Sequence, residues 1–245
     1  MTLPNNRESV MPIMGHLREL RGRLIKMILS LMGGTVLGTV FARRFLEILI
    51  LPMGNARPQS LRPAENIIVY FKVALILGLV LAMPVIIYQI VAFIVPGLTA
   101  GEKRALYFVI PGATLLFAIG VAFSSLVMLP FSLDYLGHFL SDLIQPQYSI
   151  DYYISFVANF IVWIGLSFET PLIIAFFARL GVVSPAQLRR GRRYAIVILA
   201  IVAAVITPTP DPFNMTLVML PLYALYEFGI VLARIFYRPR TRDAE

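Results

Sequence analysis

The stretch GLSFETPLII, residues 165–174, places one carboxylate, that of Glu169, inside a long apolar run. A carboxylate at the depth of a lipid bilayer is costly unless it is paired, protonated or hydrated, so it indicates a functional site. The residues alone leave three roles open for Glu169. It could be a protonated structural element, a proton-relay acid, or a polar contact for another membrane helix.

Two further acids stand in basic surroundings. Glu19 lies in HLRELRGRL, and Glu102 lies in PGLTAGEKR, which we interpret as a tight loop on the same side of the membrane. Both could form local salt bridges, for example Glu19 with Arg23 at the i,i+4 spacing. They could instead form one acidic site for a cationic peptide, because carboxylates bind guanidinium groups in two-pronged pairs that lysine cannot copy.

The chain offers little for covalent or metal chemistry. It has no cysteine, and its two histidines, His16 and His138, lie outside the apolar runs. It has no glycine-rich phosphate loop and no pair of intramembrane acids with metal-ligand spacing. The sequence therefore predicts no enzyme, no metal site and no cofactor.

The composition is that of a membrane protein. Of the 245 residues, 59% are hydrophobic and only 14% are charged, whereas about a quarter of a soluble domain is charged. The apolar residues gather in runs, and a membrane-spanning helix needs roughly 20 of them. We expect an all-α protein with six transmembrane helices, at residues 24–42, 67–95, 105–129, 152–180, 194–206 and 215–233.

The fifth run is unusually short. Residues 194–206 reach only about 20 Å as a helix, and TPTPDP, residues 207–212, cannot continue it. Such a span requires a locally thinned bilayer or a polar cavity beside it, or else it is a buried helix that its neighbours shield. The sequence does not choose between these interpretations.

The basic residues predict the orientation. The ends and loops on the side of the two termini carry 16 lysines and arginines, and the other side carries 4. This imbalance places both termini in the cytoplasm, and it argues against nucleic acid as the reason for the net charge of +8. We expect an amphipathic surface segment at residues 1–23, a membrane domain at 24–233 and a basic tail at 234–245, with no cleavable signal peptide.

Five motifs in order resemble the TatC family, the multispan core subunit of the twin-arginine protein translocase. They are HLRELRGRL, MPVIIYQIVAFIVPGL, GLTAGEKR, SFETP and ITPTPDPF. The resemblance covers nearly the whole chain. It implies a concave six-helix fold with short fifth and sixth helices, and a receptor for the signal peptides of folded precursor proteins, in which two consecutive arginines define the pathway.

The resemblance also implies roles for single residues. Glu19 and Glu102 match the positions that bind the arginine pair, and Arg21 and Phe93 match positions of the same site. Glu169 matches an intramembrane glutamate in a region that contacts the helices of the single-span partners TatA and TatB. This favours the docking role over proton relay.

Four more residues match family positions. Gln89 is an intramembrane polar position, and Asp211 belongs to the outer-loop pattern. Pro52 and Pro84 match as well, but for both prolines a role in backbone shape alone is the better interpretation, with Pro84 the natural site of a kink in its long span.

The predicted function is an inner-membrane receptor of a prokaryote that starts the export of folded proteins, works as a homo-oligomer with TatA and TatB, and depends on the proton-motive force. One alternative is a proton-coupled small-molecule transporter that uses Glu169 as its proton carrier. A scaffold that binds partners but no peptide is another, although the presence of Glu19 and Glu102 argues against it.

Overall fold

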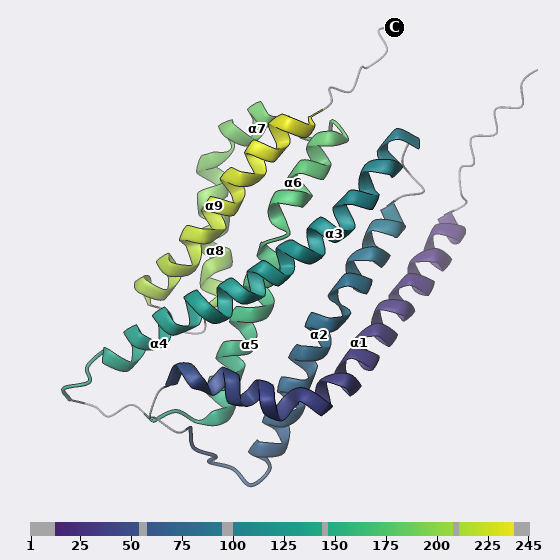
Figure 1. Ribbon diagram of the computed structural model, residues 1–245. Helices are drawn as coiled ribbons and strands as arrows, with labels where there is room; N and C mark the ends of the chain where they lie inside the picture. Colours follow the sequence, from purple (N-terminus) through teal and green to yellow (C-terminus); the bar gives the residue numbers. More distant parts are fainter. Residues whose placement is uncertain (1–12, 54–57, 95–99, 144–146, 208–210, 238–245) are drawn as a thin grey trace, which may run out of the picture.

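A computed structural model describes residues 13–53, 58–94, 100–143, 147–207 and 211–237, with the backbone alone described at residue 13 and at residues 100–108. The described chain is helical, and its only β-pairing is one isolated bridge between Gln59 and Ser149. Figure 1 shows the helices side by side in a bundle, with the start of α1 and the end of α9 at the same end of the molecule. We call this the terminal end and the opposite one the loop end.

The described chain consists almost entirely of helices that follow one another along the sequence. In chain order they are α1 (Ile13–Ile50), the 3₁₀ turn η1 (Leu51–Met53), α2 (Glu65–Ile94), α3 (Ala100–Phe123), the π-helix η3 (Ser124–Met128), α4 (Leu129–His138), α5 (Ile150–Ser167), α6 (Thr170–Arg179), α7 (Pro185–Arg190), α8 (Arg192–Ile206) and α9 (Pro212–Phe236).

Five helical segments are long and apolar enough to cross a membrane. They are Met14–Met53, Glu65–Ile94, Val109–His138, Ile150–Arg179 and Pro212–Phe236. The predicted all-α membrane fold is therefore confirmed. Helix α8 has only 15 residues, as short as the fifth run predicted. The expectation of a short sixth helix is wrong, because α9 has 25 residues.

Helix α1 differs from the expected start of the chain. The predicted surface helix is not a separate element, because α1 runs without interruption for 38 residues from Ile13 to Ile50. Its later part extends past the expected end at residue 42, so Arg43 and Arg44 belong to the helix and not to a loop. Figure 1 shows that α1 bends along its length, and its last turns cross the loop end of the bundle.

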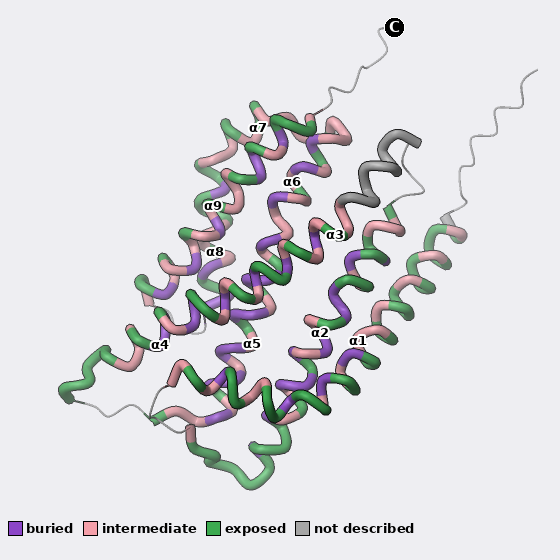
Figure 2. Tube along the Cα trace, viewed as in Figure 1, coloured by how far each residue is buried: buried purple, intermediate pink, exposed green. Residues whose placement is uncertain are grey.

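Glycines let α1 and α2 approach closely. A Cβ added at Gly34 would lie 2.5 Å from the carbonyl oxygen of Gly78, and one at Gly38 would collide with the carbonyl oxygen of Ala74. The spacing of Gly34 and Gly38 is the small-xxx-small pattern that brings membrane helices into backbone contact. This contact fixes α1, whose other faces are largely exposed, against α2 (Figure 2).

Helix α5 forms the centre of the bundle. Its side chains at Ile154, Val157, Phe160, Ile161 and Ile164 are at most 1% exposed. Figure 2 shows the buried residues along the inward faces of the helices and the exposed ones outside. Because many exposed side chains are large and apolar, the outer surface suits a hydrocarbon environment.

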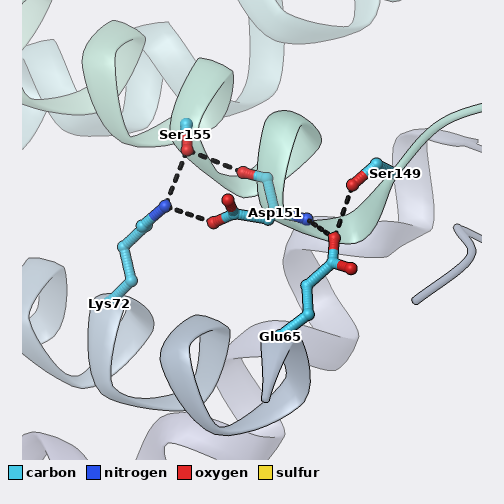
Figure 3. A network of polar contacts seen from close by, with 5 residues as sticks. All are labelled: Glu65, Lys72, Ser149, Asp151 and Ser155. Atoms are coloured by element: carbon cyan, nitrogen blue, oxygen red, sulfur yellow. Dashed lines mark hydrogen bonds and ion pairs between the residues drawn. The ribbon is translucent and has the colours of Figure 1, made fainter. Parts of the chain in front are cut away.

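A polar brace closes the loop end (Figure 3). The carboxylate of Glu65, which is 2% exposed, accepts hydrogen bonds from the backbone N–H groups of Leu61, Arg62 and Asp151 at 2.6, 2.9 and 3.1 Å, and from the hydroxyl of Ser149. These bonds join the segment before α2 to the segment before α5. A buried carboxylate is stable here because its oxygens are satisfied.

An ion pair continues this brace. Lys72 donates to Asp151 at 2.5 Å and to the hydroxyl of Ser155 at 2.7 Å, so it joins α2 to α5 (Figure 3). The backbone of Gln59 bonds on both sides of Ser149, which adds the bridge between the two loop segments. The loop end is thus tied together by side chains from two distant stretches of sequence.

Candidate functional site

A polar group at the terminal end joins α1 to α2. Arg23 donates from Nε and Nη2 to Oε1 of Glu19, at 3.0 and 2.5 Å, and from Nη1 to the side-chain oxygen of Gln89 at 3.5 Å. Glu19 and Arg23 lie one turn apart in α1, and their side chains are 23% and 19% exposed. Gln89 is buried in α2. The local salt bridge that the spacing predicts is therefore present.

Aromatic packing lies one turn further toward the terminal end. The rings of His16 and Phe93 stack with their centroids 4.4 Å apart and their planes at 25°. Phe93 is partly exposed and Arg21 is exposed on α1. The structure thus brings Glu19, Gln89 and Phe93 to the region where α1 begins and α2 ends. Arg21 is not brought into this group, because it lies two residues from Glu19 and therefore on another face of α1.

The second predicted acid, Glu102, does not lie in a loop. Helix α3 begins at Ala100, so Glu102 belongs to its first turn, and the expectation of a loop residue is wrong. Helix α3 begins at the terminal end (Figure 1), the end that also holds Glu19. The side chain of Glu102 lies outside the described residues.

Glu169 stands at a break between two helices. Helix α5 ends at Ser167 and α6 begins at Thr170, with Glu169 as its N-terminal flanking residue. The cause is Pro171, whose ring cannot accommodate the helical carbonyl of Ser167 four residues earlier. Glu169 therefore lies at the junction of α5 and α6, and it lines a groove of the protein.

This groove is apolar and open on one side. It has a volume of about 470 Å³ and is lined by α2, α3, the end of α5 and α6, with Glu169 among its lining residues. The others are Met83, Ile87, Ile90, Val91, Ile94, Val109, Ala113, Leu166, Leu172, Ile173, Phe176 and Phe177. Oε1 of Glu169 is buried and has no hydrogen-bond partner within the described part of the chain. Such an atom favours a polar group on a ligand or partner helix.

The remaining predicted residues lie elsewhere. Gln89 is not among the groove residues and belongs instead to the Glu19 group. Pro84 lies within α2, which continues through it to Ile94, and Pro52 lies in η1 at the loop end. Asp211 caps α9, where its carboxylate accepts from the backbone and side-chain N–H groups of Asn214 at 2.7 and 2.9 Å.

Residues 15–221 match the family described as Sec-independent protein translocase protein (TatC). The chain belongs to the TatC family. Curated TatC relatives include those of Deinococcus radiodurans, 40% identical over 92% of this chain and 86% of the relative, and Aquifex aeolicus, 37% identical over 94% of this chain and 98% of the relative. Family membership places the chain among the components of a protein translocase. The members of this family are not known as enzymes.

Comparison with solved structures gives the same family as comparison of sequences. A crystal structure of the twin-arginine translocase receptor TatC superimposes with a TM-score of 0.81, at 38% identity over 91% of this chain and 100% of that one. The TatC family fold therefore accounts for nearly the whole chain. The predicted resemblance is confirmed.

Sequence reasoning missed two parts of the arrangement. The link from Arg23 to Gln89 joins residues 66 positions apart, and no local pattern announces it. The brace of Glu65, Lys72 and Asp151 was also missed, although a lysine inside an apolar run is a signal that demands a nearby acid.

Proposed function

We propose that this chain is the core receptor subunit of a twin-arginine translocase, and that it binds the signal peptides of folded precursors with Glu19 and Glu102. The observation that carries the proposal is the pairing of Glu19 with Arg23. A carboxylate that accepts two N–H groups of one guanidinium is already shaped for the arginine side chain of a ligand. An incoming peptide arginine takes the place of Arg23, which keeps its contact with Gln89.

Glu102 supplies the second carboxylate in this proposal. Two acids match two arginines in charge, and the start of α3 at the terminal end supports a position near Glu19. Phe93 offers an apolar surface beside the arginines, and Arg21 is assigned to the same site by its match to the family position alone. The site uses hydrogen bonding and charge, with no covalent step and no cofactor.

The membrane placement follows from the same account. We place the chain in the inner membrane of a prokaryote with six spans, both termini and the terminal end facing the cytoplasm. The excess of basic residues at that end supports this orientation. Helix α8, with 15 residues, is the fifth of these spans in chain order and requires a thinner bilayer around it.

The apolar groove is proposed to dock a single-span partner. A transmembrane helix of TatA or TatB carrying a polar side chain would satisfy Oε1 of Glu169, and hydrogen bonds between membrane helices favour association. Several copies of the chain and its partners form the complex, and the proton-motive force drives transport.

Export in cells tests this function. The chain replaces TatC in a bacterium that lacks it, with its matched TatA and TatB, and a folded reporter carries a twin-arginine signal. Export is expected for the wild-type chain and is lost with a twin-lysine signal or with Glu19→Gln combined with Glu102→Gln. Export that survives both changes contradicts the proposal. A matched control is Glu47→Gln, because Glu47 is an exposed acid of α1 with only a surface contact to Arg43.

One observation favours a second candidate function. A buried, unsatisfied carboxylate in a groove also suits a proton-coupled transporter of small molecules. Proteoliposomes that contain this chain alone distinguish the two. The receptor account predicts no proton-driven uptake by the chain alone, whereas the transporter account predicts uptake that Glu169→Gln abolishes.

A further inference from the structure

The turn between α7 and α8 forms a basic hollow at the terminal end. It has a volume of about 340 Å³ and is lined by Ala186, Arg189, Arg190 and Arg192. Three of its four lining residues carry guanidinium groups. None of the roles given above to Glu19, Glu102 or Glu169 uses this hollow.

The charges of the hollow are only partly balanced. Arg192 donates from Nη2 to Glu227 at 2.6 Å, and this is its ion pair. Its Nε is buried and has no hydrogen-bond partner within the described residues. Arg189 and Arg190 are exposed and have no acidic group within 4.0 Å in that part of the chain. The hollow therefore keeps a net positive charge that attracts an anion.

The shape of the hollow is held by the surrounding structure. A capping box between Ser184 and Gln187 starts α7, and the hydroxyl of Tyr226 in α9 donates to the carbonyl of Leu188 at 2.7 Å. These bonds fix the short helix that carries Arg189 and Arg190. The arginines are thus presented on a defined turn rather than on a free loop.

An apolar surface begins next to the hollow. Helix α8 exposes Val197, Ile198, Ile201 and Val205, each at least 58% exposed. Between this surface and the hollow, the guanidinium of Arg193 lies over the ring of the exposed Tyr194, 4.8 Å from its centroid. Tyrosine and arginine at the end of an apolar helix are typical of the level of lipid headgroups.

We propose that this hollow binds the phosphate of an anionic phospholipid, with the acyl chains lying along the exposed face of α8. Guanidinium groups bind phosphate oxygens in two-pronged hydrogen bonds, and basic pockets beside membrane helices suit anionic headgroups. The bound lipid holds the start of the short α8 at the membrane surface. Free phosphate shares the same chemistry, and the acyl chains distinguish the lipid from it.

Native mass spectrometry of the purified full chain in detergent tests the site. Phosphatidylglycerol is titrated into the wild-type chain, into Arg189→Gln/Arg190→Gln and into the control Arg43→Gln/Arg44→Gln, with phosphatidylcholine and inorganic phosphate as further probes. The control removes two adjacent exposed arginines of α1 at a distance from the hollow. Loss of Arg189 and Arg190 is expected to weaken phosphatidylglycerol binding roughly 10- to 30-fold.

The outcomes are distinct. The proposal stands if the control binds as the wild type does and phosphatidylcholine binds far more weakly. It is overturned if the two double variants lose affinity equally, since that indicates general charge alone, or if neither does. Competition by millimolar phosphate assigns the hollow to free phosphate and overturns the lipid assignment.

Preference of the wild-type chain for phosphatidylglycerol over phosphatidylcholine tests the proposal without any variant. Signal-peptide binding is expected to be unchanged in all of these proteins.

Discussion

Arg23 places two of its N–H groups on a single oxygen of Glu19 and a third on Gln89. The proposed receptor site thus holds a guanidinium from its own chain. A signal-peptide arginine must compete with Arg23 for Glu19. When Arg23 is displaced from Glu19, it can still donate a hydrogen bond to Gln89. An internal competitor of this kind lowers the affinity for the ligand while it keeps the acid paired when no peptide is bound.

Removal of the competitor should strengthen peptide binding. Arg23→Gln is expected to tighten binding of a twin-arginine peptide by roughly three- to tenfold, because the carboxylate no longer has to exchange partners and the local charge is more negative. Isothermal titration with the purified chain measures this. Weaker binding by the variant means that Arg23 orients Glu19 for the peptide and is not its competitor.

Glu169 should matter for partners and not for peptides. Glu169→Gln keeps the size of the side chain but changes its hydrogen-bonding groups, so co-purification of TatA or TatB is expected to fall several-fold. Peptide binding at the terminal end is expected to be unchanged. Equal loss of partner and peptide binding indicates a general structural defect instead.

Two adjacent glycines of α1 provide a test of the packing against α2. Gly34→Ala is expected to destabilise the chain by about 1–3 kcal/mol, because the new Cβ would lie 2.5 Å from the backbone oxygen of Gly78. Gly33→Ala meets no atom within 4 Å and should be neutral or stabilising by about 0.5–1 kcal/mol. Unfolding in detergent compares them, and equal effects contradict the close approach.

The ion pair of the loop end should couple two helices. Lys72→Met and Asp151→Asn are each expected to destabilise the chain, with a coupling energy of about 1 kcal/mol in a double-mutant cycle. The value is modest because the two side chains remain 29% and 24% exposed, which screens the pair. Thermal unfolding of the four proteins measures it. Purely additive effects would show that the contact contributes no stability.

The sequence predicted the architecture where the signal was local. Runs of apolar residues marked the helices, and the apolar run ending at TPTPDP predicted the short α8. The break at Glu169 was not predicted, since residues 152–180 were expected to form one span, although its cause, Pro171, is visible in the residues. The length of α1 was not predicted, because polar residues such as Arg43 and Arg44 can continue a helix beyond the hydrocarbon region. The apolar run at residues 215–233 lies within α9, and the wrong expectation of a short sixth helix came from the family resemblance and not from the residues.

The site was predictable only in part. Glu19 and Arg23 lie one turn apart, so their salt bridge could be read from spacing. Contacts between distant segments, such as Arg23 with Gln89 and His16 with Phe93, depend on the register of α1 against α2. The glycine spacing in α1 marks the face that makes the backbone contact, but it does not specify that Gly78 of α2 lies opposite Gly34.

Binding of a twin-arginine signal peptide to the purified chain tests the central claim most directly. The comparison uses a twin-lysine peptide and three proteins: the wild-type chain, Glu19→Gln/Glu102→Gln and the control Glu47→Gln. The account predicts binding by the wild type and the control that requires both arginines, and a loss of at least roughly tenfold in the double variant. Equal binding of the two peptides, or equal affinity of all three proteins, contradicts it.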